Sequence, residues 1–384
     1  YKIMIPLTIP LISGNESKYV MDCLNTGWIS SAGSYVTKFE KEISNYVGSE
    51  FAVACVNGTS ALHIALMLSG VGENDYVLVP NLTFVATLNA IKYTGASPIL
   101  VDVNNDDWQM DLNLLDDFLE NKTHKVSNKN GFYTYLNSNK KRVKAILPVH
   151  VLGNIGDINR LVEISKKYNL DIIEDSSEAL GSIYKEKYAG TFGKFGVFSF
   201  NGNKIISTGG GGIIVTNNKQ LAKKAKHLTT QAKTSQIEYH HDKVGYNYRL
   251  VNVLAAIGLA QLEKMTVILK NKKKIDDFYR QELSGIGDIV FQKISKNVNP
   301  NNWLFTFRTN KMRSLLNYLN NSGIQSRPFW IPMNKLNMYC EDIYITEKNY
   351  SQLIYDTSIS IPCSAGMKDK EMEEVSNKIK KFYS

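Results

Sequence analysis

The sequence predicts an α/β protein with a mainly parallel sheet in a large domain and a smaller α/β domain at its C-terminal end. Between Phe51 and Thr216, short apolar runs alternate with amphipathic segments of helical length, which is typical of strand–helix units in a parallel sheet. Several of the predicted strands end at a polar residue. After about Gly285 the elements become shorter and follow a long helical segment, which indicates a separate domain.

The composition is that of a globular protein with a large core. The chain has 384 residues, of which 43% are hydrophobic and 21% charged, and this length favours more than one domain. The net charge is +9, with short basic clusters at Lys140–Lys144 and Lys270–Lys274 that we interpret as solvated faces. A mildly basic protein suits an anionic small substrate such as a nucleotide diphosphate, and no nucleic-acid-binding motif is present.

The cysteines and the hydropathy pattern indicate a cytoplasmic protein. Four cysteines lie far apart and form no CxxC pair, so we expect reduced, packed thiols. The sequence shows no signal peptide and no apolar run long enough to cross a bilayer, so we expect no membrane partner. His240-His241-Asp242 resembles a metal cluster only superficially, since no third ligand follows at a useful spacing, and we expect no metal site.

The N-terminal segment is predicted to be extended and then helical. Prolines favour an extended Ile5–Ser13, and helices are expected at Gly14–Leu24 and Val36–Val47. Between the helices, Gly27–Gly33 is a loop of small residues around Trp28. Such a loop could cover a pocket or simply join the two helices, and the sequence leaves both readings open.

The large domain is predicted from alternating strands and helices. The expected strands are Phe51–Val56, Tyr76–Pro80, Pro98–Val103, Val143–Val149, Leu170–Glu174, Phe195–Phe200 and Ile213–Thr216. The expected helices are Ala61–Ser69, Val85–Tyr93, Leu112–Glu120, Asp157–Tyr168 and Lys219–Leu228. Residues 121–142 are polar and basic, and we expect an exposed excursion of this domain there. A short hairpin is expected at Ser182–Ala189.

The domains are predicted as residues 1–265 and 266–384, joined by a helix of about residues 252–283 that is rich in alanine at its start. In the small domain the expected strands are Asn302–Thr309, Ile324–Arg327 and Ile359–Pro362, and the expected helices are Met312–Asn321, Asn349–Tyr355 and Lys368–Tyr383.

One lysine stands between the apolar run Phe195–Phe200 and four consecutive glycines, Gly209–Gly212. The ammonium group of Lys204 must reach water, a charged partner or a covalent bond. Burial lowers the pKa of a lysine, and an unprotonated amine can form a Schiff base. A surface turn with a solvated lysine is the alternative interpretation of this stretch.

Other polar residues follow predicted strands, where ligands bind in parallel sheets. Gly58, Thr59 and Ser60 begin a helix, so they favour either an ordinary helix cap, the commoner case, or a phosphate site. Asp175 ends an apolar strand, and it either caps a short helix or pairs with a buried positive nitrogen. Phe84 follows another strand.

Together these residues indicate a site for pyridoxal 5′-phosphate (PLP). This cofactor needs a lysine for its aldehyde, a carboxylate for its ring nitrogen, hydrogen-bond donors for its phosphate and a flat apolar cover for its ring. Lys204, Asp175, Gly58-Thr59-Ser60 and Phe84 supply these groups in turn.

With these motifs, the chain resembles the DegT/StrS-type nucleotide-sugar aminotransferases, which have the aspartate aminotransferase fold of PLP enzymes (fold type I). The resemblance runs nearly end to end. Its motifs are Phe39-Glu40, Asn57–Leu62, Pro80–Thr87, Pro148–His150, Glu174-Asp175, Ser199–Lys204, Gly245–Leu250 and Arg327-Pro328. TGWISSAG, VHVLGN and SFNGNKIISTGGGG are most similar to the subgroup that makes 4-amino sugars for legionaminic acid or bacillosamine-type glycans.

The resemblance implies a role for each matching residue. Lys204 is the catalytic residue that binds the cofactor and then moves a proton, and Asp175 pairs with the ring nitrogen. Glu178 lies near the ring hydroxyl, where the family often has His or Gln, so its role is an open question. The other implied contacts are Phe84 on the ring; Gly58, Thr59, Ser60 and Ser199 at the phosphate; Asn247 at the phosphate of the neighbouring subunit; and Trp28, Ser30, His150 and Arg327 around the sugar nucleotide.

The implied function is amino transfer from L-glutamate to C4 of a nucleotide-linked 4-keto-6-deoxy sugar for bacterial surface glycans such as lipopolysaccharide. A UDP-linked N-acetylglucosamine derivative is the expected substrate, and a homodimer with shared active sites is the expected assembly. A sugar-nucleotide 3-aminotransferase of the same family is the alternative. A related dehydrase would have histidine in place of Lys204, and a non-catalytic PLP-binding regulator would need a damaged site or an added DNA-binding segment, neither of which is present.

Overall fold

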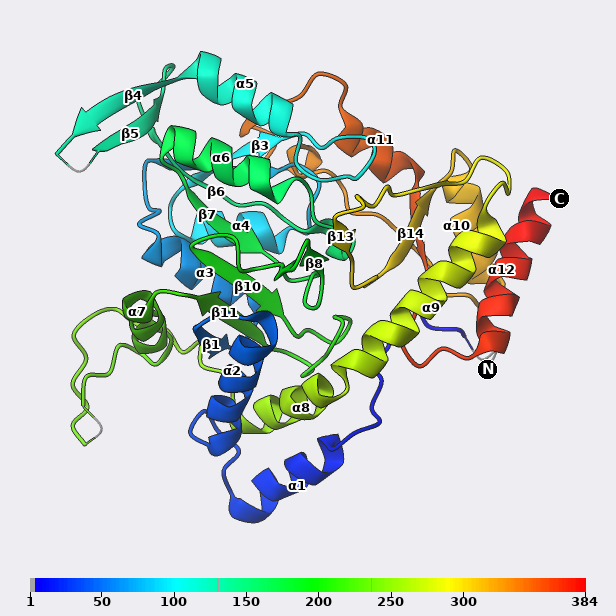
Figure 1. Ribbon diagram of the computed structural model, residues 1–384, viewed down its shortest axis with the longest axis horizontal. Helices are drawn as coiled ribbons and strands as arrows, with labels where there is room; N and C mark the ends of the chain where they lie inside the picture. The colour runs from blue at the N-terminus through cyan, green and yellow to red at the C-terminus, as the bar shows by residue number, and fades with distance from the viewer. Residues whose placement is uncertain (1–3, 130, 236) are drawn as a thin grey trace.

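The computed structural model describes residues 4–129, 131–235 and 237–384. Figure 1 shows a large α/β body, and α9 runs from it to a smaller C-terminal unit. The strands of the large sheet are β1 (Phe51–Cys55), β2 (Asp75–Pro80), β3 (Ser97–Val101), β4 (Thr123–Asn128), β5 (Gly131–Leu136), β6 (Arg142–Ile146), β7 (Asp171–Asp175), β10 (Phe195–Ser199), β11 (Gly212–Thr216) and β16 (Ile343–Ile345). The prediction of an α/β fold with a mainly parallel sheet is confirmed.

The main path of the large sheet runs β1-β11-β10-β7-β6-β2-β3-β16. The neighbours from β10 through β16 pair in parallel, whereas β11 is antiparallel to both β1 and β10. This exception arises because β10 and β11 are joined by the short segment of residues 200–211, which contains Lys204 and returns the chain beside the strand it left.

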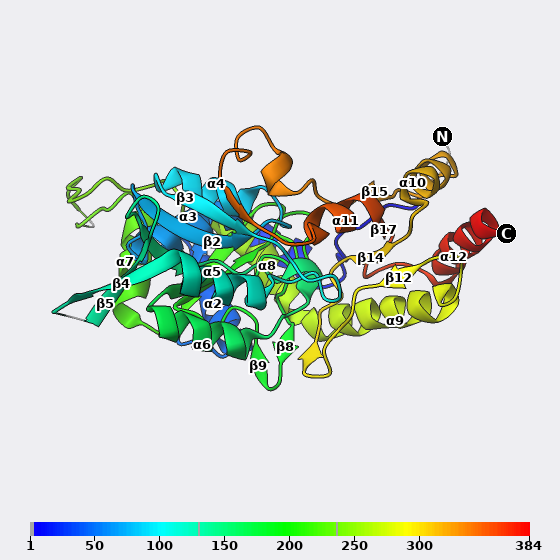
Figure 2. The same ribbon diagram turned by 90° about the horizontal axis from the view of Figure 1, so that it is seen from above.

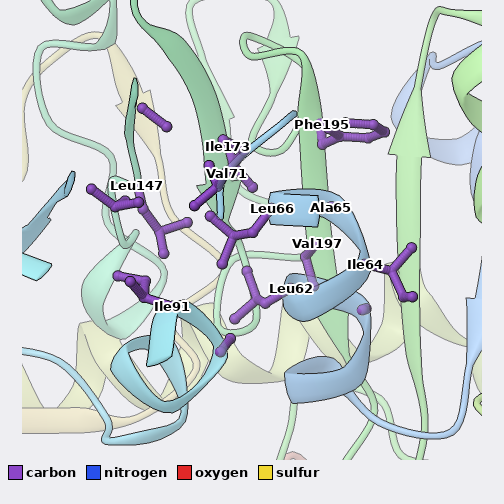
Figure 3. Close-up of a cluster of buried hydrophobic side chains, with 14 of the residues drawn as sticks. Leu62, Ile64, Ala65, Leu66, Val71, Ile91, Leu147, Ile173, Phe195 and Val197 are labelled. Carbon is purple, nitrogen blue, oxygen red and sulfur yellow. The ribbon is translucent and has the colours of Figure 1, made fainter. Parts of the chain in front are cut away.

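Helices cover both faces of this sheet, as Figure 2 shows from above. The helices of the large domain are α1 (Glu16–Thr26), α2 (Ser34–Val47), α3 (Gly58–Leu68), α4 (Ala86–Tyr93), α5 (Leu112–Lys122), α6 (Ile158–Tyr168), α7 (Lys219–Thr229) and α8 (Asn252–Glu263). On one face α3, α4 and α7 pack against the strands, and Figure 3 shows Leu62, Leu66 and Ile91 meeting Ile173 and Val197 there. On the opposite face α5 and α6 bury a second apolar cluster. The parallel strands are covered on both sides and are therefore apolar along their length.

The predicted excursion at residues 121–142 contains a β-hairpin. Strands β4 and β5 pair antiparallel, and β5 also pairs with β6, so the hairpin extends the sheet sideways from the body.

The small unit consists of a four-stranded antiparallel sheet covered by helices. Its strands are β12 (Val290–Phe291), β14 (Phe305–Arg308), β15 (Arg327–Pro328) and β17 (Ser358–Ile361), and its helices are α9 (Met265–Leu283), α10 (Met312–Asn321), α11 (Tyr350–Thr357) and α12 (Asp369–Tyr383). Side chains of α9, α10 and α12 form its core with β14 and β17. A third small sheet joins β8 (Ile183–Tyr184) and β9 (Lys187–Tyr188) to β13 (Val298–Asn299).

Two features differ from the expected domain layout. The single connecting helix predicted at residues 252–283 is two helices, α8 and α9, bent by 63° at Lys264. The bend arises where the chain changes partners, because α8 packs on α1 and α2 whereas α9 packs on α12. In addition, β16 leaves the small unit and pairs with β3 of the large sheet. The domain boundary at residue 266 stays a prediction.

Within the described residues, no single helix is long and apolar enough to cross a membrane. Helices α8 and α9 meet the length and composition criteria only when they are taken together as a bent pair.

Candidate active site

A cavity of about 320 Å³ lies at the carboxyl ends of the parallel strands, next to the segment between β10 and β11. Its size and position are those of ligand sites in open α/β sheets. Its walls are formed by Asn57, Gly58, Thr59, Leu62, Thr83, Phe84, Ala86, Thr87, Val149, Asp175, Ser177, Glu178, Ser199, Asn201, Asn203, Lys204, Gly210, Gly211, Trp303 and Trp330.

Lys204 reaches this cavity from the loop after β10. Its Nζ lies 3.7 Å from Oε1 of Glu178 and 4.0 Å from the ring centroid of Trp303. Burial lowers the pKa of the Lys204 ammonium, although Glu178 and Asp175 act in the opposite direction. The alternative of a solvated surface lysine is wrong, because the side chain is only 12% exposed. The site therefore favours an amine that loses its proton more readily than an exposed lysine.

Glu178 is held by the backbone N–H of a residue that has an unusual conformation. Its Oε2 accepts a hydrogen bond of 2.8 Å from the N–H of Leu152, and Leu152 has a φ of +60°. Few residues other than glycine adopt this conformation, and such strain concentrates at functional sites. Burial raises the pKa of Glu178 to about 7, whereas Lys204 and the Leu152 N–H lower it.

The raised pKa of Glu178 predicts a pH-dependent stability. Between pH 4.5 and 7 Glu178 keeps its proton in the folded state and loses it in the unfolded state. The resulting stabilisation of the folded state is therefore complete below pH 4.5 and is lost as the pH rises through 7. We expect Glu178→Gln to remove that loss, and the change in unfolding free energy between pH 4.5 and 7 should differ from wild type by up to about 3 kcal/mol. Urea unfolding of the cofactor-free proteins would measure it.

The exposed Glu50 offers a matched control, since Glu50→Gln removes a carboxylate outside the cavity. If the unfolding free energies of the wild-type and Glu178→Gln proteins had the same pH dependence, that result would contradict the assignment of Glu178 as a buried, titrating group.

Asp175 presents an oriented carboxylate to the cavity at the end of β7. Its Oδ2 accepts from the hydroxyl of Thr87 at 2.7 Å, and its Oδ1 accepts from the N–H of Ser177 at 3.1 Å. The side chain is 5% exposed. Two donors compensate the cost of burying the carboxylate and fix its direction.

The N-terminus of α3 lies in the wall of the cavity. Asn57 caps the helix by accepting a hydrogen bond from the N–H of Ser60, and the preceding Gly58 and Thr59 line the cavity. Their N–H groups lie in the first turn, where an α-helix leaves donors for an anion. A Cβ on Gly212 would lie 2.4 Å from the backbone of Asn57, so only glycine lets β11 pass this closely.

Comparison with known proteins identifies the family. Residues 10–380 match the model of the DegT/DnrJ/EryC1/StrS aminotransferase family. The chain belongs to this family. It is 38% identical over 383 residues to a GDP-perosamine synthase of Escherichia coli O157:H7, covering 99% of each chain, and 34% identical over 386 residues to a GDP-perosamine synthase of Vibrio cholerae, covering 99% and 100%.

A relative from Bacillus subtilis and a solved structure agree with this membership. The putative pyridoxal phosphate-dependent aminotransferase EpsN is 33% identical and covers 97% of this chain and 94% of its own. The putative sugar aminotransferase Spr1654 from Streptococcus pneumoniae, solved in its PMP form, superposes with a TM-score of 0.86 at 25% identity, covering 98% and 97% of the two chains. The chain is therefore a PLP-dependent sugar-nucleotide transaminase, and the predicted family, cofactor and enzyme class are confirmed.

The residues of this aminotransferase fit the cofactor. Lys204 and Asp175 face the same cavity, the start of α3 offers donors for a phosphate, and Phe84 supplies an aromatic side chain. The predicted contacts Gly58, Thr59, Phe84, Asp175, Glu178 and Ser199 all line the cavity with Lys204. Ser60 does not line it, and its N–H donates to the side chain of the cap residue Asn57.

The predicted sugar-nucleotide residues of the aminotransferase lie apart from this group. His150 is 2% exposed, and its Nε2 lies 2.9 Å from Oε2 of Glu174, so the ring points away from the cavity. Trp28 lies in a separate hollow beside α2, Ser30 is exposed nearby, and Arg327 is exposed on β15. Asn247 is exposed and does not line the cavity of its own chain. Their substrate and cofactor roles stay predictions.

Several cavity residues were missed from the sequence. Thr87 falls inside the motif Pro80–Thr87. A hydrogen bond from its hydroxyl to a carboxylate at a strand end could have been predicted from the sequence. Trp303 and Trp330 belong to the small unit, 99 and 126 positions after Lys204, and no local pattern connects them with that lysine. No group of three or more His, Cys, Asp or Glu side chains is placed to hold a metal ion within the described ranges.

Proposed function

We propose that this aminotransferase transfers the amino group of L-glutamate to C4 of a GDP-linked 4-keto-6-deoxy sugar. The observation that carries the chemistry is the buried Lys204 amine, which faces Asp175, Glu178 and the α3 N-terminus across one cavity. The nucleotide and the position of the amine are supported by relatives named GDP-perosamine synthase, which are 34–38% identical along nearly the whole chain. Perosamine is a 4-amino sugar. These names support GDP over the UDP sugar that the motifs favoured.

The chain's own residues divide the work. When bound, PLP supplies an aldehyde that carries the amino group and a ring that withdraws electrons. The Lys204 amine, with its lowered pKa, is placed to take or give a proton at the carbon that receives nitrogen. Asp175, oriented by Thr87 and Ser177, would keep a proton on the ring nitrogen. The first turn of α3 would bind the phosphate.

A spectroscopic cycle tests this proposal. The visible band of the bound cofactor should bleach when L-glutamate is added and return when a GDP-linked 4-keto-6-deoxy sugar follows. UDP- and dTDP-linked sugars of the same kind serve as comparisons, and NMR of the product shows whether nitrogen is at C4 or C3. If the band returns only with the UDP-linked sugar, the nucleotide of the substrate is UDP and not GDP. If the product carries nitrogen at C3, the enzyme is a 3-aminotransferase and not a 4-aminotransferase.

The proposed assembly is a homodimer in which Asn247 completes the site of the partner. Asn247 is exposed and stands outside its own cavity, which supports a contact in trans. We expect Asn247→Asp to weaken phosphate binding by charge repulsion and to lower activity on the order of 10- to 100-fold. Mixing this variant with Lys204→Ala under conditions that exchange subunits should restore about a quarter to a half of wild-type activity, because each mixed dimer then has one site with neither change.

Each variant mixed with itself is the control for subunit exchange. A mixture that stays as inactive as its two components would place Asn247 in the cavity of its own chain.

A further inference from the structure

Three aromatic side chains form a continuous wall along one side of the cavity. Phe84, Trp330 and Trp303, here called the aromatic wall, all line it. The rings of Phe84 and Trp330 meet edge to face with centroids 6.4 Å apart, and those of Trp330 and Trp303 stack at 24° with centroids also 6.4 Å apart. Phe84 comes from the large domain and both tryptophans from the small unit, so the wall forms only in the folded chain.

The wall begins at the reacting lysine. The Trp303 ring lies 4.0 Å from Nζ of Lys204, and its Nε1 donates a hydrogen bond of 2.6 Å to the carbonyl of Asn203. The carbonyl of Trp303 accepts from the buried ammonium of Lys272 at 2.6 Å. These contacts fix the wall relative to Lys204. A substrate carbon held beside Lys204 would therefore have one of its neighbouring groups next to Trp303.

The sides of the cavity that the large domain supplies are mixed, with Leu62, Ala86 and Val149 beside polar side chains. The polar side chains that are not assigned to the cofactor include Ser177 and Asn201, both from the large domain. The cavity thus offers one aromatic side and, away from it, hydrogen-bonding groups around the same amine. A sugar ring that enters it meets unlike surroundings on the two sides of its reacting carbon.

This asymmetry matches the substituents around C4 of a 6-deoxy sugar. C4 has a hydroxyl-bearing carbon, C3, on one side, and on the other it has C5, which carries the apolar C6 methyl group. The neighbours of C3 in a 3-keto sugar, C2 and C4, both carry polar groups. Placing a hydroxyl against aromatic rings without a partner costs free energy, whereas a methyl group gains from the contact.

We propose that Trp303 and Trp330 form the subsite for the C6 methyl group of the sugar, and that this contact directs C4 rather than C3 towards Lys204. The inference rests on the proposed function and names the feature of the sugar that the site selects. Phe84 remains available for the cofactor ring, at the end of the wall away from Trp303. Trp330 is half-buried and does not contact Lys204 in the way Trp303 does, so it can be changed without altering the lysine contact.

The test compares the affinities of sugar nucleotides that differ only at C6. GDP-D-rhamnose and GDP-D-mannose carry a methyl and a hydroxymethyl group, respectively, and neither has a keto group to react. Titration calorimetry on the PLP-loaded enzyme should show tighter binding of GDP-rhamnose, on the order of 10- to 100-fold, as expected for a hydroxyl placed in an apolar subsite. UDP-6-deoxyglucose and UDP-glucose, and the corresponding dTDP pair, are measured in parallel.

Two substitutions at one position separate the subsite from a general effect on folding. Trp330→Gln offers the C6 hydroxyl a hydrogen-bond partner, and the preference for the methyl group should fall to within about threefold. Trp330→Phe keeps an aromatic face and should keep the preference. Affinity for GDP alone and the visible cofactor band should be unchanged in both variants.

The outcomes distinguish this inference from the proposed function. Equal binding of the two members of a pair by the wild type, or a preference that survives Trp330→Gln, would overturn the C6 subsite and leave the aminotransferase proposal standing. A preference for the methyl group that is seen only with the UDP or dTDP pair would support the C6 subsite, and it would change the proposed nucleotide from GDP to UDP or dTDP. If no sugar nucleotide binds to enzyme with an intact cofactor band, the proposed function fails, and the subsite fails with it.

Discussion

Lys204→Ala is expected to lower kcat by at least about 10⁴-fold, the loss that follows removal of both a covalent attachment point and a proton-transfer group. Lys204 is the one lysine among the described residues that line the cavity, so no neighbouring amine can replace it. A coupled assay of glutamate-dependent amino transfer would measure the effect. Borohydride reduction followed by peptide mass spectrometry should fix the cofactor to the Lys204 peptide in the wild type only.

The matched control is Lys194→Ala. Lys194 lies at the start of the same strand–loop segment and pairs with Asp171 at 3.0 Å, outside the cavity. This variant should keep nearly full activity, since an ion pair that is partly exposed contributes little to stability. Multiple turnovers by Lys204→Ala at more than a hundredth of the wild-type rate would contradict the assignment of the catalytic amine.

Asp175→Asn is expected to lower kcat by about 10²- to 10⁴-fold. The substitution keeps nearly the same shape but removes the negative charge that would hold a proton on the cofactor ring nitrogen. The Ser177 N–H, which donates to Oδ1 of Asp175, can donate to the amide oxygen of asparagine, and the Thr87 hydroxyl, which donates to Oδ2, can instead accept from the amide NH₂. We therefore expect the fold and the cavity to remain. Single-turnover kinetics with glutamate would measure the loss separately from substrate binding.

Asp171→Asn provides a control on the same strand. Asp171 begins β7 and forms ion pairs with Lys144 and Lys194 at the opposite end from the cavity, so its loss should leave kcat unchanged. Equal effects of the two substitutions would show that β7 is sensitive to any loss of charge, and would remove the special role of Asp175.

The strand–helix order and the residues at strand ends could be predicted from the sequence. Thr59, Phe84, Asp175 and Lys204 each follow an apolar run, and parallel strands bring their carboxyl ends to one edge whatever the details of packing. The cofactor followed from the types of these residues, since a lysine, a carboxylate and a helix start together suit PLP. The local pattern was sufficient to predict these residues because strand pairing in the sheet brings residues that are distant in the sequence to one edge.

The direction of side chains and the contribution of the small unit were decided by the tertiary structure. His150 also follows a strand, but its ring turns to the buried carboxylate of Glu174, which also accepts hydrogen bonds from the N–H groups of residues 190, 192 and 193. Leu152 takes a left-handed conformation that nothing in its residue type indicates. The bend at Lys264 appears only when the two helical halves pack on different domains.

The sequence by itself therefore determined the fold class, the family and the central lysine–aspartate pair, because these depend on periodicity and on residues close to strand ends. The packing of the folded chain alone brought Trp303 to the amine of Lys204 and Trp330 against Trp303, and it separated His150 from the cavity. The physical reason is that contacts between segments about 100 residues apart depend on how whole domains pack, and no local pattern of polarity records that packing.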